Sequence, residues 1–89
     1  HVVKDNLFPV PPLFRLIQEQ SGTSWEEMYK VFNMGHRMEI YVDEELADKI
    51  IAISQSFNID AQIVGHCYDN DEGEGNKLTI ISEFGQFIY

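Results

Sequence analysis

The sequence predicts an α+β (α/β) domain: a mixed β-sheet with helices packed on it, ferredoxin-like in part. Apolar residues recur every three to four positions in three segments, which indicates amphipathic helices. Other segments alternate, or are rich in β-branched and aromatic residues, which favours strands. The chain has 89 residues, 44% of them hydrophobic, so it is long enough for one core and too short for two ordinary domains.

The first two helices are predicted from their end signals. Pro11 and Pro12 supply a fixed φ where a helix start needs no amide donor, and Gly22 marks the end. The repeat at three and four residues that indicates this helix consists of Leu13, Leu16, Ile17 and Gln20. Residues 23–26 (TSWE) are typical of a capping box that opens a second, shorter helix. Its expected inner face consists of Met28, Tyr29 and Phe32.

A strand and a third helix are expected next. Gly35 breaks the second helix, and residues 37–42 alternate, which predicts a half-buried strand. One side of this strand would carry Met38, Ile40 and Val42. Asp43 is a good N-cap, and the acidic residues that follow it favour the positive end of a helix dipole. The apolar stripe of this helix is expected to comprise Leu46, Ile50, Ile53 and Phe57.

The last third of the chain is expected to form a hairpin. Residues 61–68 favour a strand, residues 69–76 are turn-forming acids, amides and glycines, and residues 77–84 would return antiparallel. The strand, helix, strand order across residues 37–68 allows a right-handed parallel βαβ crossover. Residues 85–89 leave two alternatives open, a short tail strand or an aromatic plug.

Charge and cysteine content exclude several classes of partner. Fifteen acidic against six basic residues give a net charge of -9, which repels nucleic acid and anionic membrane surfaces. The apolar runs are far shorter than the ~20 residues that span a bilayer. The single cysteine, Cys67, cannot form an internal disulfide and suits a reducing compartment, so we expect a cytoplasmic protein.

Two incomplete metal patterns do not predict a metal site. His66 and Cys67 are adjacent, so on a strand they point to opposite faces, and Cys67 is expected to be a small buried side chain. Residues 69–76 begin like a calcium loop, but Gly73 occupies the fifth ligand position and Ile80 the twelfth. We also predict no catalytic residues here, because the sequence shows no Walker loop, dinucleotide fingerprint or local triad spacing.

The candidate binding residues are Asn33, Gly35 and Arg37. They lie where a helix end passes through a glycine turn into an extended segment. Such a junction can present backbone N–H groups to an anion, and Arg37 adds positive charge. The alternative, which the pattern alone favours, is that Asn33 and Gly35 only end the helix and turn the chain.

At this turn the chain resembles a known family. The phrases FPVPPLFRLIQ (residues 8–18) and MYKVFNMG (residues 28–35) are similar to the C-terminal domain of aminoimidazole ribonucleotide synthetase, also called phosphoribosylformylglycinamidine cyclo-ligase. An acidic-capped helix and then AQIVG (residues 61–65) follow in the order found in that family. The resemblance covers nearly the whole chain.

The resemblance implies an enzyme of purine biosynthesis that uses ATP and magnesium to activate the formyl oxygen of formylglycinamidine ribonucleotide and closes the imidazole ring. Residues 1–89 would be one partial domain without a cofactor of its own. Its partners would be the N-terminal nucleotide-binding domain of the same protein, which is absent here, and a second copy in a homodimer. Asn33, Gly35 and Arg37 would lie near the substrate's phosphate. Family members usually have glycine where Arg37 stands, and its guanidinium can instead pair with a phosphate.

A second hypothesis is a stand-alone small α+β binding or regulatory module without enzymatic activity. The orderly core pattern and the lack of catalytic residues favour it. The coding sequence upstream of His1 distinguishes the two, because a long upstream domain is expected only for the enzyme.

Overall fold

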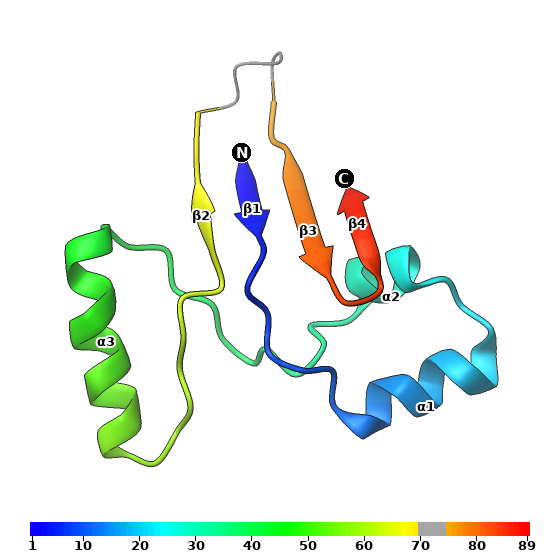
Figure 1. The fold of residues 1–89 in the computed structure, drawn as a ribbon, viewed down its shortest axis with the longest axis horizontal. Helices are drawn as coiled ribbons and strands as arrows, with labels where there is room; N and C mark the ends of the chain where they lie inside the picture. The colour runs from blue at the N-terminus through cyan, green and yellow to red at the C-terminus, as the bar shows by residue number, and fades with distance from the viewer. Residues whose placement is uncertain (70–74) are drawn as a thin grey trace.

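The computed structural model describes residues 1–69 and 75–89 and confirms the α+β class (Figure 1). Its helices are α1 (Pro12–Ser21), α2 (Trp25–Val31) and α3 (Glu44–Ser56). Its strands are β1 (Val2–Lys4), β2 (Gly65–Cys67), β3 (Leu78–Ser82) and β4 (Gly85–Ile88). Among the described residues, no helix has the length and apolarity that a membrane crossing demands.

The four strands form one mixed sheet in the order β2-β1-β3-β4. β1 is antiparallel to β2 and parallel to β3, so Val2 lies opposite Cys67 on one side and Leu78 on the other. The predicted pairing of residues 61–68 with 77–84 is therefore wrong, because β1 lies between β2 and β3 (Figure 1). The hairpin that does form joins β3 to β4, and residues 85–89 take the tail-strand alternative.

The strand predicted at residues 37–42 is absent, and with it the crossover predicted over residues 37–68. Met38 and Ile40, which were expected to face the core, are 79% and 55% exposed. The segment instead crosses over the sheet, where Glu39 pairs with Lys4 of β1 at 2.8 Å. A strand needs a hydrogen-bonding neighbour, and residues 37–42 are not part of the sheet β2-β1-β3-β4. Alternation alone therefore did not make this segment a strand.

All three helices begin and end close to the predicted positions. α1 follows Pro11 and stops at Gly22, whose φ of 68° is left-handed. α2 is capped by Ser24, whose hydroxyl accepts the Glu27 N–H at 3.3 Å, so the cap lies one residue later than the predicted box. α3 has Asp43 at its N-cap position.

The core is small and lies where α1 and α2 meet the β3–β4 turn. Met28 is fully buried, as predicted for α2, together with Val10 and Met34. Half-buried rings surround these three residues: Phe14, Trp25, Tyr29, Phe32 and Phe84. On α1, Phe14 and Ile17 pack on the core, whereas Leu13 and Leu16 of the predicted helical repeat are exposed.

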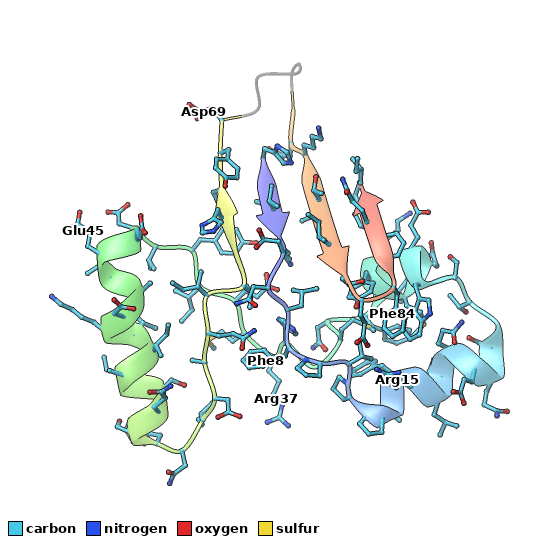
Figure 2. The ribbon with its side chains drawn as sticks, in the orientation of Figure 1. Phe8, Arg15, Arg37, Glu45, Asp69 and Phe84 are labelled. Atoms are coloured by element: carbon cyan, nitrogen blue, oxygen red, sulfur yellow. The ribbon has the colours of Figure 1, made fainter. Side chains whose placement is uncertain are left out.

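Phe84, in the β3–β4 turn, ties both of these helices to the sheet. Trp25 of α2 stacks on its ring at 3.7 Å with an interplanar angle of 6°. Arg15 of α1 lies 5.3 Å from the centre of the same ring and pairs with Glu83 at 2.6 Å (Figure 2). These contacts hold both α1 and α2 against the β3–β4 turn.

α3 contributes nothing to this core. It contains no buried residue, and Ile53 and the following Phe57 are 61% and 72% exposed, so its predicted stripe does not face the core. The helix stands beside β2 at the left of Figure 1. The radius of gyration is 14.6 Å, against about 12 Å for a compact chain of this length. The molecule therefore carries an uncovered apolar helix face.

Two further predictions concern the second half of the chain. Cys67 is exposed rather than buried, because β2 forms one edge of the sheet. The hairpin loop and the calcium-like pattern at residues 69–76 lie mostly outside the described residues.

Candidate functional site

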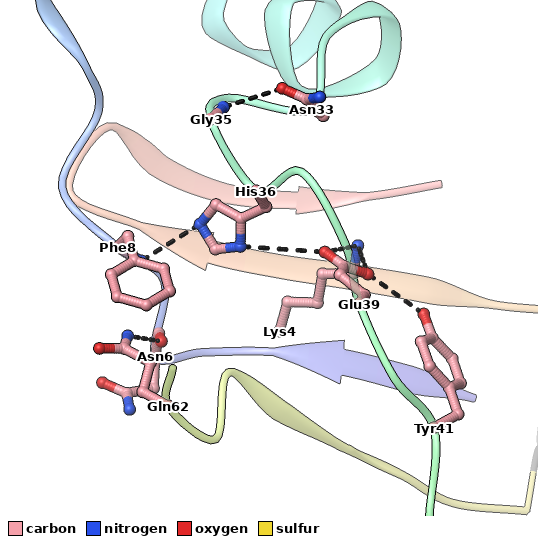
Figure 3. Close-up of polar contacts among 9 residues, drawn as sticks. All are labelled: Lys4, Asn6, Phe8, Asn33, Gly35, His36, Glu39, Tyr41 and Gln62. Atoms are coloured by element: carbon pink, nitrogen blue, oxygen red, sulfur yellow. Dashed lines mark hydrogen bonds and ion pairs between the residues drawn. The ribbon is translucent and has the colours of Figure 1, made fainter. Parts of the chain in front are cut away.

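The turn after α2 is held by the side chain of Asn33 (Figure 3). Its Oδ1 accepts the Gly35 N–H at 2.9 Å, and its backbone carbonyl accepts the His36 N–H at 3.0 Å. Met34 and Gly35 both have positive φ, 54° and 89°. The N–H groups of Gly35 and His36 already donate to Asn33. An anion at this turn would therefore be contacted mainly by side chains.

Gly35 also sits directly against the start of α1. A Cβ at this position would lie 2.7 Å from Cγ of Pro11, which is closer than side-chain carbons approach. The positive φ and the close contact each favour glycine. The structure therefore agrees with the interpretation that Asn33 and Gly35 end α2 and turn the chain, whereas anion binding stays a prediction.

A polar cluster lies beneath this turn, and sequence reasoning did not identify it. The side chain of His36 is only 6% exposed, and its Nε2 accepts the Phe8 N–H at 3.2 Å. Its Nδ1 faces Glu39 Oε1 at 3.9 Å, and both oxygens of Glu39 contact Lys4 Nζ, at 2.9 and 2.8 Å (Figure 3). The one sequence signal was a histidine placed directly after a glycine turn.

Burial disfavours the protonated form of the His36 imidazole. Desolvation lowers its pKa from the ordinary value of 6.5; Glu39 opposes this shift and Lys4 adds to it. A neutral imidazole can accept a hydrogen bond at Nε2, as the contact with Phe8 requires. The observed geometry therefore depends on the neutral form.

A pocket of about 220 Å³ opens between this cluster and the sheet. Its polar wall consists of Lys4, Asn33, His36 and Glu39, and its apolar wall includes Leu7, Tyr29 and Ile80. Small-molecule sites usually measure about 300–1,000 Å³, so this pocket has room for part of a nucleotide and not for all of it.

Of the three predicted site residues, only Asn33 lines this pocket. Arg37 is exposed and forms no ion pair with any residue within ranges 1–69 and 75–89 (Figure 2). Its guanidinium is available to an anionic ligand at the surface beside the turn. Within the same ranges, no three His, Cys, Asp or Glu side chains are grouped to hold a metal ion.

Comparison with known proteins identifies the family. The family described as AIR synthase related protein, C-terminal domain, matches residues 3–76. The chain belongs to this family. The match confirms the resemblance seen in the sequence, and the part of this AIR synthase related domain that it covers includes residues 3–4 of β1, the 33–37 turn and the polar cluster.

The curated relatives of this AIR synthase related domain are much longer proteins. A phosphoribosylformylglycinamidine cyclo-ligase of Methanococcus vannielii is 43% identical over 82 residues, which cover 90% of this chain and 24% of the relative. That of Methanocaldococcus jannaschii is 43% identical over 75 residues, or 84% and 21%. One from Staphylococcus aureus is 36% identical over 64 residues, or 72% and 19%. The chain thus spans about a quarter or less of the length of these relatives.

Proposed function

We propose that the chain is the C-terminal part of an ATP-dependent phosphoribosylformylglycinamidine cyclo-ligase, which closes the imidazole ring of aminoimidazole ribonucleotide in purine biosynthesis. The observation that carries this proposal is the identity of up to 43% to relatives that bear that name, over 90% of this chain. In this proposal the chain forms one wall of a cleft, and the rest of the protein forms the other wall.

Within that cleft, Asn33 and Arg37 contact the phosphate of the ribonucleotide, and Gly35 shapes the turn that presents them. The exposed guanidinium of Arg37, which has no partner among the described residues, supports this role. A guanidinium can bind phosphate through two parallel N–H donors. The side-chain amide of Asn33, on the wall of the pocket, adds a polar contact nearby.

ATP and magnesium belong to the remainder of the enzyme in this proposal. When bound, ATP supplies the phosphoryl group that activates the formyl oxygen. This chain's contribution is to hold the ribonucleotide.

The proposed partners are the N-terminal nucleotide-binding domain of the same protein and a second copy in a homodimer, in the cytoplasm. The uncovered apolar face of α3 supports a partner surface, because large apolar patches of this kind usually meet another protein surface. Size-exclusion chromatography of the full-length protein tests the dimer.

The activity is tested with the full gene that encodes the chain. Expressed in a bacterium that lacks its own cyclo-ligase gene, it should restore growth without purines. The purified protein should convert formylglycinamidine ribonucleotide to the imidazole product only with ATP. A protein that fails both tests would contradict the proposed function.

The site is tested by Arg37→Ala. We expect the KM for the ribonucleotide to rise about tenfold or more, since charge-assisted hydrogen bonds contribute about 1.5–3 kcal/mol each. Lys30→Ala on the exposed side of α2 removes the same charge away from the turn and should leave KM unchanged. Equal KM values in the two variants would show that Arg37 does not contact the ribonucleotide.

A further inference from the structure

We propose that His36 is a positioning residue: through its neutral Nε2 it fastens the 33–37 turn to the segment between β1 and α1. This inference rests on the proposed function, since it makes His36 the residue that places Asn33 and Arg37 against the substrate. His36 itself does not touch the substrate in this proposal.

The 33–37 turn is attached to the segment before α1 at two neighbouring points, His36 and Gly35. The Phe8 N–H donates to His36 Nε2 at 3.2 Å, and the ring of Pro11 packs directly on Gly35. Phe8 also contacts the imidazole edge to face, with ring centres 5.3 Å apart. Because these contacts come from one short segment, loss of the hydrogen bond leaves the turn held mainly at Gly35.

The hydrogen bond from Phe8 requires an unprotonated Nε2 on His36. A protonated imidazole has N–H groups at both nitrogens, so Nε2 would then oppose the Phe8 N–H. The charged groups that face the ring are the Glu39 carboxylate, at 3.9 Å from Nδ1, and Lys4, which pairs with Glu39. Tyr41 Oη also contacts Glu39, at 3.4 Å. Glu39 favours an imidazolium and Lys4 opposes it, but in either case protonation of Nε2 removes the acceptor of the Phe8 N–H and releases the turn.

Two substitutions separate the acceptor from the rest of the side chain. His36→Gln can place an amide oxygen where Nε2 stands and cannot become protonated near neutral pH, whereas His36→Leu removes the acceptor. In the full-length enzyme at pH 8, His36→Leu should raise the KM for the ribonucleotide roughly two- to tenfold, the range of one lost hydrogen bond, with little change in kcat. His36→Gln should stay within about twofold of the wild type.

The pH profile gives a readout that a purely structural role would not move. As pH falls below 6.5, the KM of the wild type should rise relative to that of His36→Gln, because only the wild type loses its acceptor. The substrate phosphate titrates equally in both experiments, so its effect cancels in the ratio of the wild-type KM to the His36→Gln KM. Parallel profiles, or a His36→Gln variant as impaired as His36→Leu, would overturn the proposal.

A spectroscopic experiment decides the inference even if the cyclisation activity is not found. The full-length protein is labelled with ¹⁵N-phenylalanine, and Phe8→Tyr assigns the Phe8 amide by removing its signal. We expect this amide proton to shift with a midpoint below pH 6.5 in the wild type and to stay constant in His36→Gln. An amide that ignores pH in the wild type would refute the hydrogen bond that the proposal requires.

Discussion

Substituting Gly35 by alanine tests how the turn is built. Two separate effects should destabilise this variant. The residue has a φ of 89°, which L-residues rarely adopt, and its new Cβ would lie 2.7 Å from Cγ of Pro11. That carbon belongs to a ring joined to the backbone at the start of α1, so it cannot rotate away as the end of a long side chain would.

The expected magnitude follows from these two effects. A left-handed conformation costs an L-residue about 1–2 kcal/mol, and forcing an extra carbon into a packed contact costs about 1–3 kcal/mol. Gly35→Ala should therefore lower the free energy of unfolding by about 2–5 kcal/mol. Gly22→Ala is the matched control, because Gly22 has a φ of 68° but its added Cβ meets nothing within 4 Å. Gly22→Ala should therefore lose only about 1–2 kcal/mol of unfolding free energy, the part that comes from the left-handed conformation.

Urea unfolding followed by the fluorescence of Trp25, the one tryptophan of the chain, measures both variants. The pair Gly35→Ala and Pro11→Ala forms a double-mutant cycle, in which Gly35→Ala should cost less once the proline ring is gone. Equal losses for Gly35→Ala and Gly22→Ala, together with no coupling to Pro11, would refute the steric explanation.

Two further predictions concern the core and pH. Phe84→Ala should cost about 2 kcal/mol, less than the ~3–5 kcal/mol of a fully buried phenylalanine, and should shift the emission of Trp25 to longer wavelength; unchanged emission would mean that the two rings do not stack in solution. The free energy of unfolding should fall as pH drops from 6.5 to the lowered pKa of folded His36, because the unfolded chain then binds a proton that the folded chain does not. Urea titrations at several pH values should show this extra loss in the wild type and not in His36→Gln.

The helices were predictable because their signals are local. Pro11, Ser24 and Asp43 stand at or next to the observed starts, and Gly22 at the end of α1. The buried side of α1 was not predictable in the same way. Both Leu13 and Phe14 belong to apolar patterns of helical spacing, and only the position of the β3–β4 turn decides which of them is covered.

The sequence predicted a mixed sheet but not which strands pair in it, because strand pairing depends on residues that are distant in the sequence. β1 is three residues long, and nothing near Val2 and Val3 indicates that they form an inner strand. The close approach of β1 explains why residue 65 is a glycine, because a Cβ there would lie 1.9 Å from the Val3 carbonyl oxygen. A glycine at the start of a strand therefore signalled close backbone approach, without naming the neighbour.

The residues that build the 33–37 turn were predicted only in part, and the role of this turn in ligand binding stays a prediction. Asn33 and Gly35 were recognised from helix-end chemistry, and the hydrogen bond between them is present. His36 could not be recognised, since its partner is a backbone N–H on another segment and its burial depends on the fold. A side chain that bonds to a backbone group does not require any particular residue type at its partner, so the sequence does not indicate the contact.

The position of β1 has a consequence for how the chain folds as the ribosome synthesises it. Val3 pairs with His66 and Thr79, both synthesised long after it, so on the ribosome the first strand waits unpaired while almost the whole chain emerges. Long-range pairings of this kind form slowly, and chains with exposed unpaired strands are prone to aggregate. Expression yield should therefore be sensitive to changes in these few residues.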